Sequence, residues 1–459
     1  MAFFPALVTY PSVLGEIYSA AFTAPAFNWL CSPACTELET IVMDWVAKAL
    51  ALPEDFLSTS SGGGGGVIHG SASEAVITAM VAARERYLRE KVDTEGLEEG
   101  SHERDDRIAF LRGRLVALSS DQAHSSTPKG AKIAGTRHHC ISTSLASGLA
   151  LTAPRLKKAL EECYDQGLEP YYVTLSLGTT NTCAVDDFAS IAALRSEYPN
   201  LWIHIDAAYA GAAMVLPQYQ TQYSTDIGKV SDSFNVNMHK WLLVNFDASC
   251  FFVKNRNHLT RALAITPAYL QNSFTDSGLV TDYRDWQIPL GRRFRALKIW
   301  FVMRTYGVEG LRKHIANSIS IGEKFADMVR GRNDLFEIVA EPKFALTCLR
   351  VKPEAAFAAS QNRIREEGGH ESSGISSDLN RIHPPQAHSL DEPTRQASNF
   401  TKRAADLINS RGQIFITAST LADVTFIRVI SGHPAASVEY LGYAWRVIVE
   451  TVEEILSAP

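Results

Sequence analysis

Short apolar runs alternate with helix-like segments from Thr40 to Ala296, and this alternation constrains the fold more than any other feature of the chain. The helix-like segments carry apolar residues at the spacing of one helix face, whereas the apolar runs have the length of buried strands. Such alternation is typical of a doubly wound, mostly parallel sheet. We therefore predict an α/β fold with a large domain at residues 40–300. The helical segments are residues 44–51 and 73–90, and the strand-like runs are residues 115–118, 171–177, 201–205 and 249–253.

The pattern changes after Trp300. A long helix is expected there, followed by strands near residues 344–351, 413–417 and 424–430, which predicts a smaller C-terminal α+β domain at residues 301–459. Within it, residues 366–398 are rich in Gly, Ser, His and Pro and contain few large apolar side chains. Because burial cannot offset the entropy of ordering such a segment, we predict a disordered surface insertion there. Residues 1–39 are expected to form a separate N-terminal segment.

The charge balance excludes two classes of partner. The 459 residues include 44 Lys and Arg against 50 Asp and Glu, which gives a net charge of −6. This composition supplies no extended basic field for nucleic acid or an anionic membrane. The uncharged stretch at residues 17–36 contains Pro25, Asn28 and Pro33, so it is too polar to span a membrane, and no basic residue precedes Lys48 as a secretory signal requires. We interpret the stretch as buried or subunit-covered protein surface.

The cysteines also carry information. Seven of them are scattered along the chain without a CxxC pair, which predicts free thiols in a reducing, cytoplasmic compartment. His138, His139 and Cys140 adjoin one another, but adjacent side chains do not readily converge on one ion, and no second ligand pair has zinc-site spacing. We therefore predict no metal site.

A glycine-rich segment is a candidate anion site. Ser61 is followed by five glycines at positions 62–66, and then by Ser71, Ser73 and a helix rich in Ala and Val. Glycines let backbone N–H groups approach a ligand, and a helix that begins near Ser73 adds its free N–H groups and positive dipole end. Without a Walker A lysine or a GxGxxG motif, a small phosphorylated cofactor is favoured over a nucleotide. A flexible loop with a serine helix cap explains the segment equally well.

An acidic residue follows the apolar run at residues 201–205. Asp206 begins the sequence Asp-Ala-Ala-Tyr-Ala-Gly, and the carboxyl end of a strand is where open α/β sheets bind their ligands. The same residue type also caps helices frequently, and from the residues alone the two interpretations are equally strong.

A lysine lies within a polar group of residues in an otherwise apolar neighbourhood. Lys240 is flanked by His239 and Trp241 and follows Asn237. Desolvation lowers the pKa of an amine, and a neutral amine can attack an aldehyde to form a Schiff base, as in pyridoxal phosphate enzymes. An exposed lysine at the end of a loop is the structural alternative.

These segments occur in one order with several others: residues 32–39, 70–75, 121–126, 177–180, 206–211, 237–241 and 282–293. Over nearly the whole chain, this set resembles the group II pyridoxal-phosphate decarboxylases of fold type I, most closely the aromatic L-amino-acid decarboxylases. The resemblance implies that Lys240 binds pyridoxal 5'-phosphate covalently and that Asp206 pairs with the pyridine nitrogen. It places His124 and Ala208 on the two faces of the ring and Thr180 near the ring hydroxyl. It assigns the phosphate to Ser71, Ala72, Ser73, Asn237 and His239.

The resemblance also suggests how the substrate reacts. Tyr269 matches a mobile catalytic-loop tyrosine that returns a proton to the substrate Cα, whereas relatives with Phe there release an aldehyde in an oxygen-dependent reaction. Aromatic and proline side chains near the N-terminus suit an aromatic substrate, and Gly291 permits tryptophan without excluding tyrosine, dopa or 5-hydroxytryptophan. The expected substrate-binding residues are Phe4, Pro5, Pro25, Phe27 and Gly291, and the expected products are an arylalkylamine and CO₂.

The N-terminus departs from the family pattern, because the chain starts just after the helical extension that wraps around the partner subunit in relatives. The family forms homodimers with a shared active site, and we expect this dimer contact to be weakened. Three alternatives stay open: the same scaffold acting on another amino acid such as histidine or glutamate, an aromatic aldehyde synthase, and an inactive cofactor-binding partner of a full-length relative.

Overall fold

The computed structural model describes all residues except 1, 266, 268–269, 279, 367–389 and 459. The chain divides into two compact units, Pro5–Asn317 and Met1–Phe4 with Ser318–Pro459. The division therefore falls inside the long helix α12 (Ala296–Arg330) rather than after residue 300. Most of the expected N-terminal segment belongs to the large unit, because Leu7 N–H donates to the carbonyl of His239 (2.9 Å) and the Thr9 hydroxyl to that of Leu243 (2.7 Å).

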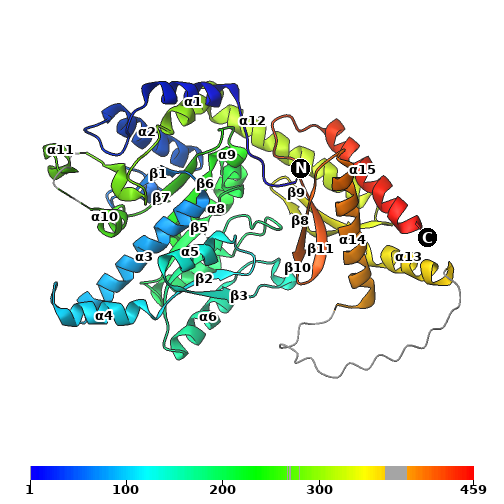
Figure 1. Cartoon of the computed structure of the whole chain (residues 1–459), viewed down its shortest axis with the longest axis horizontal. Helices are drawn as coiled ribbons and strands as arrows, with labels where there is room; N and C mark the ends of the chain where they lie inside the picture. The colour runs from blue at the N-terminus through cyan, green and yellow to red at the C-terminus, as the bar shows by residue number, and fades with distance from the viewer. Residues whose placement is uncertain (1, 266, 268–269, 279, 367–389, 459) are drawn as a thin grey trace. The chain divides into compact units, whose positions relative to one another are not determined.

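A seven-stranded sheet forms the centre of the large unit, in the order β1-β7-β6-β5-β4-β2-β3 (Figure 1). All neighbouring pairs from β6 to β3 are parallel, and β7 pairs antiparallel with both β6 and β1. Six strands thus share one direction, which confirms the predicted mostly parallel α/β sheet. The strands are β1 (Gly65–His69), β2 (Leu115–Ser120), β3 (Arg137–Ile141), β4 (Glu169–Ser176), β5 (Trp202–Asp206), β6 (Ser233–Asn237) and β7 (Ser249–Val253).

Helix α3 (Ala72–Thr94) covers the central strands and supplies much of the core. The Ser71 hydroxyl accepts a hydrogen bond from Glu74 N–H (3.2 Å) and so caps its first turn. Buried alanines let the helix approach the sheet closely. The other helices of this unit are α1 (Tyr10–Phe22), α2 (Pro33–Ala49), α4 (His102–Arg112), α5 (Ser126–Ala134), α6 (Ala153–Asp165), α7 (Phe188–Ala192), α8 (Pro217–Val230), α9 (Met238–Trp241), α10 (Asn257–Leu263), α11 (Ser273–Asp276) and the first part of α12.

The glycine run at residues 62–66 has a different role from the one predicted. Gly65 and Gly66 are the first residues of β1, so the run lies at the opposite end of that strand from Ser71. A Cβ atom on Gly66 would overlap the side chains of Met43 and Phe252. The glycines at this point therefore permit close packing, and only the segment after His69 remains a candidate anion site.

The smaller unit contains an antiparallel four-stranded sheet in the order β10-β11-β9-β8. Its core lies between this sheet and helices that include α14 and α15. Residues 391–398, which were predicted to belong to a disordered insertion, are instead ordered, because Asp391 caps α14 and Ala397 and Ser398 are buried in it. The elements are β8 (Phe336–Lys343), β9 (Leu346–Val351), α13 (Pro353–Glu366), α14 (Glu392–Arg411), β10 (Thr417–Leu421), β11 (Val424–Ile430) and α15 (Val438–Ser457).

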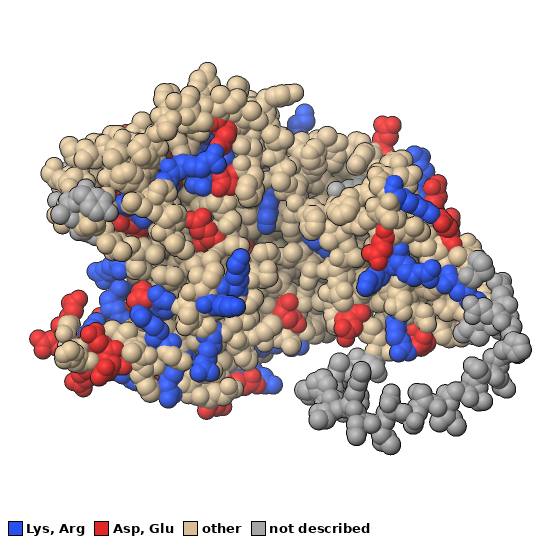
Figure 2. All heavy atoms as spheres, in the orientation of Figure 1, with Lys and Arg blue, Asp and Glu red and all other residues tan. Residues whose placement is uncertain are grey.

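Helix α1 presents apolar side chains to solvent. In the single chain Tyr10 is 89% exposed, Ile17 59% and Phe22 68%, and the last two belong to the stretch at residues 17–36 that was predicted to be buried or covered by a subunit. Figure 2 shows a largely uncharged surface over this part of the molecule. Among the helices that the structure describes, none combines the length and apolar character that crossing a bilayer requires.

Candidate active site

The carboxyl ends of five strands bring the predicted site residues to one edge of the large sheet. Ser176 at the end of β4 is in register with Asp206 at the end of β5, and Asp206 with Asn235 on β6. Asn237 ends β6 opposite Ser249, which is also in register with His69 at the end of β1. The segments that follow these ends carry Ser71, His124, Thr180, Ala208 and Lys240.

Lys240 lies on the one-turn helix α9, which begins directly after β6. Burial lowers the pKa of its amine, while the nearby Asp206 carboxylate and Cys183 act in the opposite direction. A larger neutral fraction makes this amine a better nucleophile toward an aldehyde than a solvent-exposed lysine.

Asp206 is oriented by a chain of hydrogen bonds across β5 and β6. Trp202 Nε1–H donates to the Ser233 hydroxyl (2.8 Å), so the hydroxyl hydrogen is available to His204 Nδ1 (2.8 Å). His204 Nε2–H then donates to Asn235 Oδ1 (2.8 Å), and Asn235 Nδ2 donates to Asp206 Oδ1 (3.4 Å).

The backbone N–H of Ala208 donates to the same oxygen of Asp206 (3.0 Å). Asp206 is 8% exposed, so these donors hold a carboxylate inside the protein. His204 and Asn235 were not predicted as site residues, although the pattern of polar residues on neighbouring strand ends could have indicated them.

His124 lies on the segment after β2. Its Nδ1 accepts a hydrogen bond from Ser126 N–H (3.1 Å) and contacts the Ser126 hydroxyl (2.9 Å), which leaves the proton of the neutral ring on Nε2. Partial desolvation lowers the pKa of His124, Asp206 raises it and Lys240 lowers it. His124, Asp206 and Lys240 are therefore close enough to influence one another electrostatically.

The predicted phosphate-binding residues lie at the N-terminus of α3 and the end of β6. Ser71, Ala72 and Ser73 form the first turn of α3 and its cap, where free N–H groups and the helix dipole favour an anion. Asn237 Oδ1 and the Ser249 hydroxyl are buried and have no hydrogen-bond partner among the described residues. A buried amine, a carboxylate and unused polar atoms at one edge fit a phosphorylated cofactor that carries an aldehyde.

One predicted cofactor contact, His239, already has hydrogen-bond partners within the protein. His239 Nδ1 lies 3.0 Å from the carbonyl oxygen and 2.9 Å from the N–H of Ala248, and its ring packs edge-on against Phe246. Burial lowers the pKa of His239 to about 4, so it is neutral at pH 7. Thr180 is half-buried, whereas the neighbouring Thr179 uses its hydroxyl to accept from Ala184 N–H (3.1 Å).

Ion pairs fix the loop that follows Lys240. The Asp247 carboxylate accepts from Arg295 Nε (3.1 Å) and Nη2 (2.9 Å). On the same side, Lys298 donates to Glu16 (2.8 Å). A Cβ atom on Gly70 would lie 2.9 Å from Asp247 Oδ2, so this network also borders the start of α3. Asp247 and Arg295 were not predicted as site residues, because charges so far apart in the chain carry no local pattern.

The predicted substrate-binding residues are less closely grouped. Phe27 N–H donates to the carbonyl of Pro25 (2.8 Å), and the carbonyl of Gly291 accepts from Gln287 (3.3 Å). Pro5 begins the large unit, whereas the Phe4 ring in the smaller unit lies 5.1 Å from the guanidinium of Arg428. Tyr269 lies outside the described residues.

Known proteins match this chain over most of its length. The family model described as "Pyridoxal-dependent decarboxylase conserved domain" matches residues 1–352. The aromatic-L-amino-acid decarboxylase of Cavia porcellus is 44% identical over 351 residues, which is 76% of this chain and 70% of that protein. The phenylacetaldehyde synthase of Arabidopsis thaliana is 37% identical and covers 99% of this chain and 82% of its own length.

A solved structure agrees with these sequence matches. The crystal structure of Oryza sativa TDC with PLP and tryptamine superimposes with a TM-score of 0.84 and 31% identity, over 99% of this chain and 84% of that one. The fold, the buried lysine with its carboxylate and the family match agree with one another. The chain belongs to the pyridoxal-dependent decarboxylase family, whose members are carboxy-lyases that use pyridoxal 5'-phosphate.

Proposed function

We propose that this protein removes the carboxylate of an aromatic L-amino acid and releases the arylalkylamine and CO₂. The observation that carries the proposal is the convergence of Lys240, Asp206 and His124 at the carboxyl edge of the sheet, within electrostatic range of one another. The names of the relatives, aromatic-L-amino-acid decarboxylase among them, support an aromatic substrate.

Pyridoxal 5'-phosphate, when bound, supplies an aldehyde for covalent attachment and a protonated ring that takes up the electron pair left by CO₂. Lys240 is the attachment residue, because burial lowers the pKa of its amine and so raises its neutral fraction. Ser71, Ala72 and Ser73 bind the phosphate at the start of α3, with Asn237 and His239 beside them.

Asp206 would pair with the ring nitrogen of the bound cofactor. The hydrogen-bond chain from Trp202 to Asn235 holds its carboxylate in one orientation, so little reorganisation is needed when charge develops. His124 and Ala208 lie on the segments after β2 and β5, and they would enclose the cofactor ring. Thr180 contributes from the loop after β4.

We propose tryptophan, tyrosine, dopa and 5-hydroxytryptophan as candidate substrates. Phe27 and Pro25 provide an aromatic and apolar surface in the large unit, and Gly291 has no atom within 4 Å of the position of a Cβ. Space at Gly291 suits a wide ring system such as indole. Pro5 completes the proposed set within the large unit.

We further propose a homodimer in the cytoplasm. The exposed side chains of Tyr10, Leu14, Ile17 and Tyr18 recur at the spacing of one face of α1. A contiguous apolar surface of this kind is unfavourable in water and suits a protein–protein interface. A second copy of the chain is the partner that the family resemblance implies.

A second candidate function is the oxygen-dependent formation of an aromatic aldehyde. The phenylacetaldehyde synthase of Arabidopsis thaliana covers 99% of this chain, which keeps this reaction open. Tyr269 favours the amine, because its hydroxyl can return a proton to the substrate before oxygen reacts.

One assay separates these reactions. Purified protein with pyridoxal 5'-phosphate is incubated under air with the four candidate amino acids and with histidine and glutamate, and the products are identified by mass spectrometry. We expect amine and CO₂ from at least one aromatic substrate, and little aldehyde or hydrogen peroxide. Turnover of histidine or glutamate alone would contradict the aromatic assignment, and turnover of none would leave the inactive-partner alternative.

The attachment residue is tested separately by borohydride reduction and peptide mapping. The reduced cofactor should be found on the peptide that contains Lys240, and Lys240→Ala should abolish both labelling and turnover. A label on another lysine would contradict the assignment.

A further inference from the structure

A cavity in the large unit is lined by residues outside the candidate active site. It encloses about 480 Å³ between α2, α8 and α12, which is within the usual size of small-molecule sites. The residues that characterise it are Trp45 and Lys48 on α2, Gln220 on α8, and Met303, Arg304 and Arg312 on α12. None of them belongs to the proposed catalytic or cofactor-binding set.

The lining of this cavity has one sign of charge. Lys48, Arg304 and Arg312 line it, and no Asp or Glu is among the lining residues. Arg312 is held in place by the carbonyl of Val215 (2.8 Å) and by Glu309 (2.6 Å). Lys48 and Arg304 form no side-chain hydrogen bond or ion pair with any residue that the structure describes. Two cations are therefore available to an anion in a protein of net charge −6.

The rest of the lining is apolar or donates hydrogen bonds. Trp45 is half-buried, and its indole N–H has no partner among the described residues. Met303 and Val308 supply apolar surface, and the Gln220 amide donates to the carbonyl of Ala49 (3.1 Å). A ligand that matches this lining has an acidic group for the cations and a flat apolar body for the indole.

The cavity depends on a break in α12. Gly307 has a φ of 62° and a ψ of −179°, so the helix is kinked at this residue. Met303 and Arg304 precede the kink, and Val308 and Arg312 follow it. A ligand in the cavity would therefore contact both parts of the helix.

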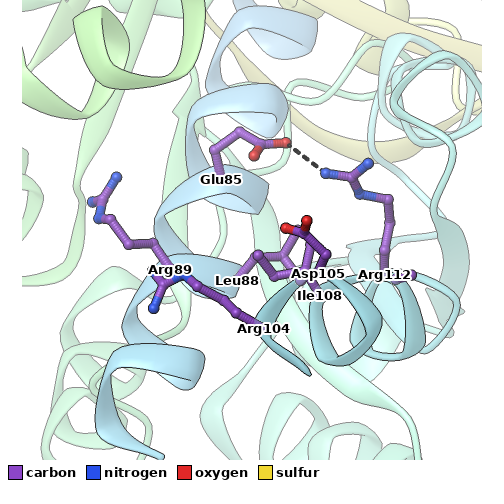
Figure 3. A pocket seen from close by; sticks show the side chains of 8 residues that line it. Glu85, Leu88, Arg89, Arg104, Asp105, Ile108 and Arg112 are labelled. Carbon is purple, nitrogen blue, oxygen red and sulfur yellow. Dashed lines mark ion pairs between the residues drawn. The ribbon is translucent and has the colours of Figure 1, made fainter. Parts of the chain in front are cut away.

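A comparison with another cavity shows why these charges are significant. The cavity used for comparison, of about 410 Å³ between α3 and α4, is lined by arginines and also by Glu85 and Asp105. Figure 3 shows Glu85 and Arg112 facing each other across it, and they form an ion pair at 3.6 Å. Arg104 there is paired with Asp93 (2.7 Å). Charges in that cavity are largely compensated by one another, whereas Lys48 and Arg304 are not.

We propose that the cavity at the α12 kink binds an organic anion composed of an aromatic body and one acidic group. Lys48 and Arg304 bind the acidic group, and Trp45 with Met303 contacts the ring. The site is separate from the proposed reaction, so the proposal does not depend on which substrate the enzyme uses.

Naphthalene-2-sulfonate is a suitable probe, and its binding is measured by isothermal titration calorimetry with the cofactor-loaded enzyme. We expect one saturable site per chain. The double variant Lys48→Glu/Arg304→Glu should weaken binding at least tenfold, because both cations become anions. Trp45→Ala should also weaken it, while Trp45→Phe should retain most of the affinity.

A matched control separates site binding from general charge effects. Lys132→Glu/Arg261→Glu makes the same change in net charge at positions that do not line the cavity, and it should leave the affinity unchanged. Equal weakening by both double variants would overturn the proposal, as would a dissociation constant that Lys48→Glu/Arg304→Glu does not alter. Loss of probe binding in Asp206→Asn with retention in Lys48→Glu/Arg304→Glu would place the probe in the active site and would also overturn it.

Discussion

Gly178 is the position where one added methyl group should disturb the site most clearly. It has a φ of +87°, and a Cβ atom there would overlap the Cβ of Ala210. Its N–H donates to the carbonyl of Ala184 (3.1 Å), and the preceding Leu177 N–H donates to the carbonyl of Asp206 (3.0 Å). Gly178→Ala therefore combines a strained backbone with a steric conflict beside the Asp206 turn.

The two costs can be calculated separately. A left-handed backbone costs an L-residue about 1–2 kcal/mol. Overpacking a buried contact adds about 1–3 kcal/mol. We therefore expect Gly178→Ala to lower the free energy of unfolding by roughly 2–5 kcal/mol in urea titrations. The N–H of the neighbouring Leu177 donates to the carbonyl of Asp206, so a shift at Gly178 should also displace Asp206. The affinity for pyridoxal 5'-phosphate, measured by absorbance titration, should therefore fall as well.

Two further variants test this reasoning. Gly135 has a similar φ of +69°, but no atom lies within 4 Å of the position of a Cβ. Gly135→Ala should therefore lower the free energy of unfolding only by the cost of the left-handed backbone. In Gly178→Ala/Ala210→Gly the overlapping methyl group is removed, and the next atoms of residue 210 lie at 3.7 Å. The double variant should be more stable than the sum of its single changes predicts, by about 1–3 kcal/mol. Strict additivity, or equal costs for Gly178→Ala and Gly135→Ala, would refute the steric argument.

Three other predictions concern charge and proton transfer. Asp206→Asn keeps an oxygen atom that can accept the hydrogen bonds of Ala208 and Asn235, but it loses the negative charge. The cofactor should therefore still bind, while turnover should fall about ten- to a hundredfold. Unchanged turnover would show that the carboxylate only caps the following turn. Tyr269→Phe should shift the products under air from amine toward arylacetaldehyde, ammonia and hydrogen peroxide, and amine alone at the original rate would contradict its role as proton donor. Between pH 6.5 and 4 the unfolded chain should bind protons that the folded chain does not, so acidification should lower the free energy of unfolding. The decrease should be at most about 1.4 kcal/mol per pH unit for each buried histidine. Asp186 partly opposes it, because burial raises the pKa of this carboxyl group to about 7. A urea midpoint that rises on acidification from pH 6.5 to 5 would contradict this prediction, which rests on burial lowering the pKa of four histidines to about 4: His69, His204, His239 and His258.

Local patterns were sufficient to predict a mostly parallel sheet and to identify Lys240 and Asp206 as candidate site residues, whose roles came from the family resemblance. Asp206 is the last residue of β5, which largely coincides with the predicted apolar run at residues 201–205, whereas β6 before Lys240 was not predicted because it alternates apolar and polar residues. The strand β1 was missed because two of its five residues are glycines, which have low strand propensity and are present here for packing. The C-terminal strand β8 was missed because it is only partly buried and lacks a continuous apolar run.

Interactions between distant segments could not be predicted in this way. The ion pair of Asp247 with Arg295 and the hydrogen-bond chain to Asp206 depend on which strands become neighbours. The same holds for the α12 cavity, whose cations lie on separate helices. A single sequence shows which residues are polar, but the charges that face one another follow from topology.

The pairing of β1 with β7 has a consequence for how the protein is made. Gly65 pairs with Val253, so the first strand of the sheet has no partner until almost all of the large unit has been synthesised. At about 5–20 residues per second, the ribosome needs roughly ten to forty seconds to reach β7 after β1 has emerged. During that interval β1 and the apolar face of α3 are exposed on the nascent chain, and an exposed strand edge favours aggregation. Production in a heterologous host should therefore improve when translation is faster or when chaperones that shield nascent chains are supplied.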